Sequence, residues 1–138
     1  MNKAVLDTDT LSAIIRQDPI ATSHAQAYLT AHSRLTISII TRFEILRGLN
    51  AKNATAQIAA FHALCQSIEV LPITDDIIVR AAEIYGKLHQ AGQLVGDADI
   101  LIAATCLELG CEIVTNNTAH FSRIQGLPVV NWLAQQTP

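Results

Sequence analysis

Polar side chains that could bind a cation stand where the predicted strands end or the predicted helices begin. Asp7 and Asp9 follow the first apolar run of the chain, and Glu44 comes soon after the second. Asp99 opens the most apolar helical segment, and Asn117 follows the last long strand-like run. The carboxyl ends of parallel strands form the crevice in which α/β proteins bind ligands. Because close carboxylates repel one another unless a cation joins them, this pattern indicates cation-dependent chemistry.

The residue types favour Mg²⁺, with Mn²⁺ as the second choice. Two unit charges 4 Å apart repel by about 4 kcal/mol at an effective dielectric of 20, so Asp7, Glu44 and Asp99 together need a divalent ion. Oxygen ligands select Mg²⁺ or Mn²⁺, and no set of Cys and His has the spacing of a zinc site. Thr115 and Asn116 are expected to orient metal-bound water. A metal that is held by carboxylates and open to solvent suits phosphodiester hydrolysis.

Helix capping is the competing explanation for the acidic residues. Asp9 or Thr8 is a suitable N-cap for the first helix, which leaves Asp7 at the strand end as the stronger metal ligand. Asp97 is a natural N-cap for the helix that contains Asp99. Two residues on a helix point in directions about 200° apart, so both acids cannot serve one site equally. If one of them caps the helix, the other is free to bind a metal.

Composition narrows the class of protein. The 138 residues suit a single domain. Half of the residues are apolar and only 4% are aromatic, so the core must consist mainly of aliphatic side chains. The net charge of -3 argues against coating nucleic acid by bulk charge, although local basic patches remain open. Three cysteines without CxxC spacing, no signal-peptide pattern and no apolar stretch of about 20 residues indicate a cytoplasmic protein without a membrane span.

Short apolar runs alternate with longer segments that have helical spacing. The predicted strands are Lys3–Leu6, Leu35–Ile39, Ile68–Ile73, Glu112–Thr115 and Val129–Val130. The predicted helices are Thr10–Gln17, Ile20–Ala31, Ile40–Asn50, Ala54–Cys65, Asp75–Ala91 and Ala98–Leu109. Crossovers between parallel strands are long and helical, so this order predicts an α/β fold with a mainly parallel sheet of four to five strands and helices on both faces.

Several segments resemble, in order, the motifs of VapC-type toxins, which are PIN-domain ribonucleases. These segments are Leu6–Asp9, Thr41–Gly48, Asp99–Ala104 and Val114–Phe121, and Gly126–Trp132 is similar to the C-terminal strand of the family. The resemblance covers essentially the whole chain. It implies a single PIN domain over residues 1–138 with a PIN-like three-layer α/β/α architecture.

The resemblance also implies a function, namely the toxin component of a type II toxin–antitoxin system that acts as a Mg²⁺-dependent endoribonuclease. Asp7, Glu44 and Asp99 match the acidic metal-binding positions of the family, and Asp9 fits the position beside the first acid. Asp97 falls outside the main motif, and we expect it to cap its helix. Asn117 stands where many PIN domains carry a fourth acid, so neutral groups are expected to complete the catalytic site. The family further implies a cognate VapB-type antitoxin, a homodimer and a tRNA substrate, with the anticodon loop of initiator tRNA as the leading expectation.

RNA binding would depend on local positive charge. Arg42 and Arg47 flank Glu44, and Arg16 is expected near the same edge of the sheet. Each contact with a phosphate would add salt-sensitive affinity. The alternative is that these arginines are solvated or paired surface residues, and Arg47 stands at the i, i+3 spacing of a weak helical ion pair with Glu44.

Two other classes share the first acidic motif. A haloacid-dehalogenase-like phosphatase would use Asp7 as the phosphoryl acceptor and Asp9 as a general acid. Its final acidic motif should follow a strand, whereas Gly96–Asp97 follows a predicted helix. A receiver-type signalling domain, which is not an enzyme, would need a phosphorylatable Asp after the third strand, whereas Asp75 and Asp76 begin a helix. These two classes are the alternatives to the nuclease.

Overall fold

The computed structural model describes residues 1–134, and residues 135–138 of the expected domain lie outside the described part. The strands are β1 (Ala4–Leu6), β2 (Thr36–Ser38), β3 (Glu69–Leu71), β4 (Glu112–Val114) and β5 (Val129–Val130). The helices are α1 (Thr8–Ile15), α2 (Pro19–Ala31), α3 (Ile39–Ala51), α4 (Thr55–Ser67), α5 (Asp75–Gln90), α6 (Asp97–Leu109) and α7 (Thr118–Phe121).

The strands form one sheet with the order β3-β2-β1-β4-β5, and every neighbouring pair is parallel. Leu6 at the end of β1 lies opposite Ile37 of β2 and Val114 of β4. The residues that follow these three therefore meet at the same edge of the sheet. The predicted α/β fold with a mainly parallel sheet is confirmed. Receiver domains have the strand order 2-1-3-4-5, so the receiver-type alternative is wrong.

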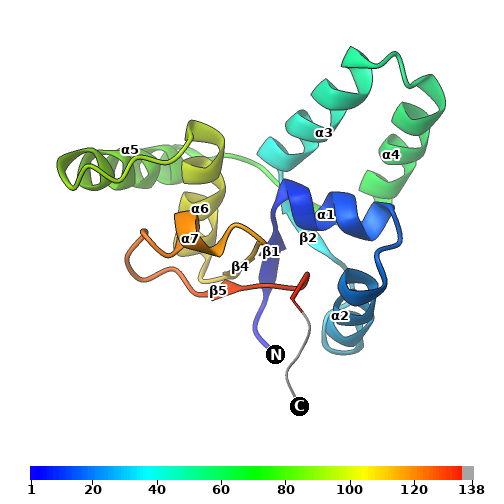
Figure 1. The fold of residues 1–138 in the computed structure, drawn as a ribbon, viewed down its shortest axis with the longest axis horizontal. Helices are drawn as coiled ribbons and strands as arrows, with labels where there is room; N and C mark the ends of the chain where they lie inside the picture. Colours follow the sequence, from blue (N-terminus) through cyan, green and yellow to red (C-terminus); the bar gives the residue numbers. More distant parts are fainter. Residues whose placement is uncertain (135–138) are drawn as a thin grey trace.

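Helices cover both faces of the sheet and give the predicted three layers. Figure 1 shows α5 and α6 on one side of the strands and α1 to α4 on the other. Val5, Ile102 and Ile113 are buried in the cluster on the side of α5 and α6. Leu6 and Tyr28 are buried in the cluster on the opposite side. Successive side chains of a strand point to opposite faces, so β1 supplies both cores, as expected of a central parallel strand.

The first helix begins at Thr8 rather than at Thr10. Asp7 has an extended backbone, and its Oδ1 accepts a hydrogen bond of 2.9 Å from the backbone N–H of Thr10. Asp7 is therefore the N-cap, and the competing explanation, in which Asp9 or Thr8 fills this role, does not hold. The consequence is a fixed orientation for the Asp7 carboxylate, because one of its oxygens is held by the helix that it starts.

The N-terminus of α6 also differs from the prediction. Gly96 is the N-cap residue, with an extended backbone and no side-chain cap bond. Asp97 is the exposed first residue of the helix, so the prediction that it caps α6 is wrong. The predicted end of the helix is confirmed, because Gly110 takes the left-handed conformation with a φ of 69°. Asp99 remains in the first turn of α6, where a negative charge complements the helix dipole.

None of the helices within residues 1–134 combines the length and the apolar character that crossing a membrane would require.

Candidate active site

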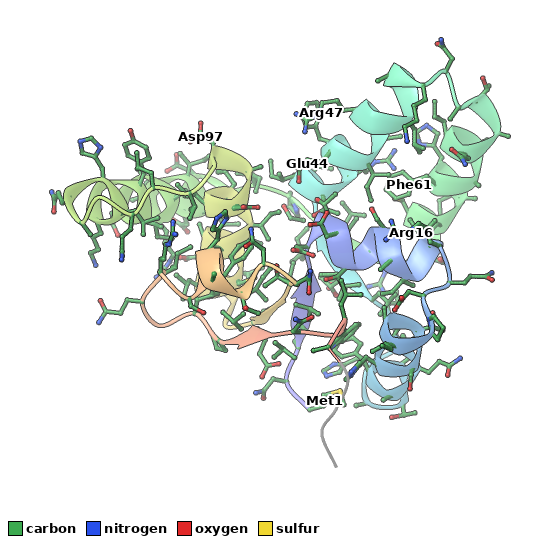
Figure 2. All side chains as sticks on the ribbon, viewed as in Figure 1. Met1, Arg16, Glu44, Arg47, Phe61 and Asp97 are labelled. Carbon is green, nitrogen blue, oxygen red and sulfur yellow. The ribbon has the colours of Figure 1, made fainter. Side chains whose placement is uncertain are left out.

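A surface pocket of about 140 Å³ lies at the carboxyl edge of the sheet, between α1, α3, α6 and α7. Carboxylates and small polar groups dominate its lining, which consists of Asp7, Thr8, Asp9, Glu44, Asp99, Asn117 and Phe121. Figure 2 shows Glu44 on the side of α3 that faces α6. The structure therefore brings together, from four separate segments, the acids and the amide that the sequence singles out. We name this hollow the acidic pocket.

Asp7 is the most enclosed acid of the pocket, with 6% of its surface exposed. Burial raises the pKa of this carboxyl, while hydrogen bonds from the Thr115 hydroxyl and the Thr10 backbone N–H oppose the rise. Thr115 is fully buried, and its hydroxyl oxygen also accepts a bond of 2.9 Å from the Asn117 backbone N–H. Thr115 therefore fixes Asp7 and the following turn, and its burial does not fit the expected role of orienting water.

Glu44 is held by one donor from α1 and one cation from α3. The Thr8 hydroxyl donates a hydrogen bond of 2.6 Å to Glu44 Oε1. Arg47 Nη2 lies 3.7 Å from Glu44 Oε2, which is the i, i+3 ion pair considered from the sequence. The Thr8 bond orients the Glu44 carboxylate at the wall of the acidic pocket, while Arg47 at the surface competes with any cation for the other oxygen.

Asp99 experiences the negative charge of the whole pocket. Its pKa is raised, first by burial and then by the carboxylates of Glu44 and Asp7, while His120 opposes the rise. No side chain within residues 1–134 donates a hydrogen bond to the Asp99 carboxylate under ordinary distance limits. A half-buried carboxylate with like charges around it and no donor is an unfavourable arrangement that a cation would relieve.

The amides after β4 take different positions. Asn117 lines the acidic pocket, and its Nδ2 donates a hydrogen bond of 2.7 Å to Nδ1 of His120. Because this contact uses one of the two amide N–H groups, the carbonyl oxygen and the second N–H of Asn117 remain available. Asn116 is exposed, and its Oδ1 accepts a bond of 3.3 Å from Asn131 Nδ2. The structure therefore places Asn117 in the pocket and Asn116 outside its lining.

The three arginines expected to contact RNA do not gather at this pocket. Arg42 contacts His62 at 2.9 Å and lies over the ring of Phe61 at 5.8 Å, on the α4 side of α3. Arg16 lines a different groove, between α1 and the pair of helices α3 and α4. Only Arg47, through its pair with Glu44, stands beside the acidic pocket. The prediction that all three share one edge therefore holds for Arg47 alone.

The donor set suits a hard divalent cation. Four carboxylates line the pocket, and neither His nor Cys is among the lining residues, which favours oxygen-preferring ions. Within residues 1–134, no three His, Cys, Asp or Glu side chains are grouped tightly enough to enclose a metal ion as they stand. The carboxylates stay apart partly because Thr8 and Arg47 already hold the two oxygens of Glu44. The residues fit a metal in kind and charge, and binding would draw the carboxylates inward.

Sequence reasoning missed three participants in this site. Thr8 was considered only as a cap, yet its hydroxyl contacts Glu44 from α1. Phe121 belongs to α7, a short helix that the sequence analysis did not predict, and it closes one wall of the pocket. His120, to which the sequence analysis gives no role, contacts Asn117. The i, i+3 spacing of Asn117 and His120 was the available signal for α7.

Comparison with known proteins agrees with this architecture. A profile of the PIN domain family matches residues 4–127. Ribonuclease VapC1 of Haemophilus influenzae is 26% identical over 129 residues, which cover 93% of this chain and 96% of that protein. The tRNA(fMet)-specific endonuclease VapC of Salmonella typhimurium is 30% identical over 134 residues, which cover 96% of this chain and 99% of that protein.

Solved structures give the same result. The crystal structure of DNA-bound VapBC from Salmonella typhimurium contains a chain that superimposes with a TM-score of 0.84 at 30% identity. The match covers 96% of this chain and 99% of that chain. An all-parallel sheet with a carboxylate pocket at its carboxyl edge is thus the PIN architecture, and the chain belongs to the PIN domain family. Within that family its similarity is to VapC proteins over nearly their full length, so the haloacid-dehalogenase alternative is wrong.

Proposed function

We propose that this chain is the toxin component of a type II toxin–antitoxin system and that it acts in the cytoplasm as a Mg²⁺-dependent endoribonuclease. The observation that carries the proposal is the convergence of four carboxylates from three separate segments in one surface pocket. Such a cluster is unfavourable without a cation. The name of the relative from Haemophilus influenzae, Ribonuclease VapC1, supports the same reaction class.

Asp7, Glu44 and Asp99 would hold the ion, with Asp9 at the exposed side of the acidic pocket. A divalent cation held there would supply a water molecule of lowered pKa and would offset the charge that develops on the phosphoryl group. The chain contributes fixed carboxylate positions, because Asp7 is held by α1 and Glu44 by Thr8. These constraints reduce the reorganisation that hydrolysis of the phosphodiester bond requires.

Asn117 supplies the neutral group of the site. In many PIN domains an acid stands at this position, so the pocket here has one charge fewer. Its carbonyl oxygen can accept a hydrogen bond from water or bind a cation weakly, while one of its two amide N–H groups contacts His120. This charge balance supports one tightly bound ion rather than two. Mn²⁺ has the same preference for oxygen ligands and is expected to substitute for Mg²⁺.

The substrate that we propose is tRNA, with the anticodon loop of initiator tRNA as the leading site of cleavage. The relative from Salmonella typhimurium is named a tRNA(fMet)-specific endonuclease. A single-stranded loop also suits the geometry, because sequence-specific proteins read RNA mainly through unstacked bases in loops. Arg47 stands beside Glu44 at the pocket, where its side chain can reach a substrate phosphate.

A VapB-type antitoxin is the proposed protein partner. A groove of about 530 Å³ lies between α1 and the helices α3 and α4, with Ile15, Leu49, Phe61 and Leu64 among its apolar lining residues. Figure 2 shows Arg16 on α1 and Phe61 on α4 on the two sides of this space. A helix with one apolar face is the kind of segment that such a groove accepts. A small gene beside the gene for this chain is expected to encode the antitoxin, and its product should inhibit cleavage.

A homodimer is the proposed assembly of the free toxin. Large apolar side chains are exposed on two helices: Phe43 on α3 is 58% exposed, and Ile78 and Tyr85 on α5 are 48% and 45% exposed. Ile78 and Tyr85 border one shallow hollow together with Leu101, and grouped apolar side chains at the surface are typical of protein interfaces. Light scattering should give the mass of two chains for the wild type, and a monomer would contradict this part of the proposal.

Cleavage of a tRNA pool tests the function. The purified wild-type protein with Mg²⁺ should produce discrete fragments from total tRNA, and primer extension should map the cut to an anticodon loop. EDTA should abolish the fragments, as should Asp7→Asn, which keeps a residue that can cap α1. A wild-type protein that leaves RNA intact but hydrolyses a generic phosphate monoester would overturn the proposal.

A further inference from the structure

Positive charge is distributed unevenly over the described surface. The chain has nine Lys and Arg residues in total. Four of them form ion pairs with glutamates, namely Lys3, Arg34, Arg47 and Arg80. Arg42 contacts His62 and Phe61. Within residues 1–134, the cations without an ion pair or an aromatic contact are Arg16, Lys52, Lys87 and Arg123, and they occur in two places.

Arg16 and Lys52 border the apolar groove described above, whereas Lys87 and Arg123 lie together in another hollow. This second hollow has a volume of about 270 Å³ and lies between α5, the end of α6 and the segment after α7. Arg80 also lines it, so three cations stand there against one acid of the lining, Glu83. We name it the basic hollow. The net charge of its lining side chains is opposite in sign to that of the acidic pocket.

The structure connects the basic hollow to the acidic pocket by two elements. Phe121 at the end of α7 lines the acidic pocket, and Arg123 follows it in the chain and lines the basic hollow. Along α6, Asp99 lines the acidic pocket and Leu107 lines the basic hollow. At a rise of 1.5 Å per residue, these two residues are about 12 Å apart along the helix axis. One extended RNA strand is long enough to contact both sites.

The side chains in the basic hollow suit phosphate oxygens. Lys87 is exposed and has no ion pair within residues 1–134, so its ammonium group is free to bind an anion. Arg123 is exposed, and its Nη1 donates a bond of 3.3 Å to the backbone oxygen of Leu94. This bond orients the guanidinium group while its other N–H groups remain available. Gln93 and Gln125 add neutral donors to the lining.

We propose that the basic hollow binds backbone phosphates of the RNA strand whose neighbouring phosphodiester enters the acidic pocket. This inference rests on the proposed nuclease function, and it names the surface that supplies affinity for the substrate. The acidic pocket repels a polyanion until a cation is bound, so binding energy must come from a different part of the surface. Lys87 and Arg123 supply it, with Arg80 as a partly neutralised third cation because of its pair with Glu108.

The experiment measures binding of a fluorescent anticodon stem-loop RNA by anisotropy, in EDTA so that no cleavage occurs, over a series of salt concentrations. Each phosphate contact with a single strand contributes about -0.7 to the slope of log K against log salt. For the double variant Lys87→Gln/Arg123→Gln, the slope of log K against log salt should therefore be less steep by about 1.4. This variant should also bind about tenfold more weakly than the wild type at low salt.

The matched control is Arg16→Gln/Lys52→Gln, which removes the same charge from the other unpaired cations and should change the slope much less. Circular dichroism of both double variants should match that of the wild type. If the wild type binds and cleaves RNA and the Lys87→Gln/Arg123→Gln variant has the same RNA affinity and salt slope, this inference alone is overturned. The same holds if the control variant loses as much affinity and slope as Lys87→Gln/Arg123→Gln. A wild-type protein that binds no RNA at any salt concentration in EDTA would also overturn this inference, whereas the proposed function is overturned only if the protein fails to cleave RNA when Mg²⁺ is present.

Discussion

The hydroxyl of Thr8 donates a hydrogen bond of 2.6 Å to Oε1 of Glu44, and so links the first turn of α1 to α3. The two residues are far apart in sequence, and they meet because β1 and β2 are neighbouring parallel strands. The bond orients one of the carboxylates that would hold the metal. Thr8 is therefore a positioning residue, and it acts through Glu44.

Thr8→Val should reduce nuclease activity without unfolding the protein. Valine keeps the shape of threonine but cannot donate to Glu44, so the carboxylate loses its orientation. Loss of a group that orients a metal ligand typically lowers metal affinity or activity by about 10- to 100-fold. The measurement is the initial rate of RNA cleavage over a Mg²⁺ titration, with Thr30→Val as the control because Thr30 lies on α2 and bonds to its own helix. An unchanged Mg²⁺ dependence would contradict the positioning role.

Asp99→Asn should stabilise the fold while it abolishes cleavage. Burial and the neighbouring carboxylates raise the folded-state pKa of Asp99 above its ordinary value. Between the pKa of Asp99 in the unfolded state and its higher pKa in the folded state, the folded protein binds more protons, so stability falls as pH rises through this range. Removal of the charge should raise the free energy of unfolding at pH 7 by about 0.5 to 2 kcal/mol, the usual size of a stabilising substitution.

Urea unfolding in EDTA at several pH values measures this effect. The advantage of Asp99→Asn should shrink as pH falls toward the ordinary carboxyl pKa of about 4. Asp97→Asn is the matched control, since Asp97 is an exposed acid on the same helix turn and does not line the acidic pocket. Equal stabilities of Asp99→Asn and the wild type at pH 7 would show that the pocket carboxylates do not repel one another appreciably.

Divalent cations should raise the melting temperature of the wild-type protein. A ligand that binds only the folded state stabilises it by about 2.7 kcal/mol at a concentration 100 times its Kd, which corresponds to several degrees for a domain of this size. Mg²⁺ and Mn²⁺ should both give this shift, and Asp99→Asn should reduce it strongly. A shift of the same size in Asp97→Asn and Asp99→Asn would place the ion outside the acidic pocket.

His120→Ala should lower the rate of cleavage by about tenfold, within the range for residues that orient a group of the site. His120 accepts the Asn117 amide N–H at 2.7 Å and so determines which end of that amide faces away from it. His120→Asn keeps an acceptor near the position of Nδ1 and should restore most of the activity. If Ala and Asn at this position gave the same rate, the hydrogen bond to Asn117 would have no positioning role.

The order of the elements followed from the sequence because local signals and burial agree. Each strand is a short apolar run, and each crossover is helical, so parallel pairing was the consistent solution. The ends of elements were less predictable. The predicted strand Leu35–Ile39 is shorter in the structure, because Ser38 accepts a hydrogen bond from Ile40 N and so begins α3. Such a choice between strand and helix is decided by tertiary position rather than by residue type.

The charged residues of the acidic pocket could be predicted from the sequence, but the residues that contact them could not. Asp7, Glu44 and Asp99 follow from the rule that parallel strands end at one edge of a sheet. The contact of Thr8 with Glu44 depends on the crossing of α1 and α3, which no local pattern contains. The same limit explains the basic hollow, because Lys87 and Arg123 belong to different elements that are brought together only by the fold.

The most direct test of the metal-dependent nuclease is a single-turnover assay on one purified, end-labelled tRNA at saturating Mg²⁺. Wild-type protein is compared with Asp99→Asn and with Asp97→Asn, whose sites are two positions apart on the same helix turn. We expect Asp97→Asn to cleave at the wild-type rate and Asp99→Asn to lose at least about 100-fold, with no cleavage by any of them in EDTA. Wild-type cleavage that persists in EDTA, or in Asp99→Asn at the wild-type rate, would contradict the account.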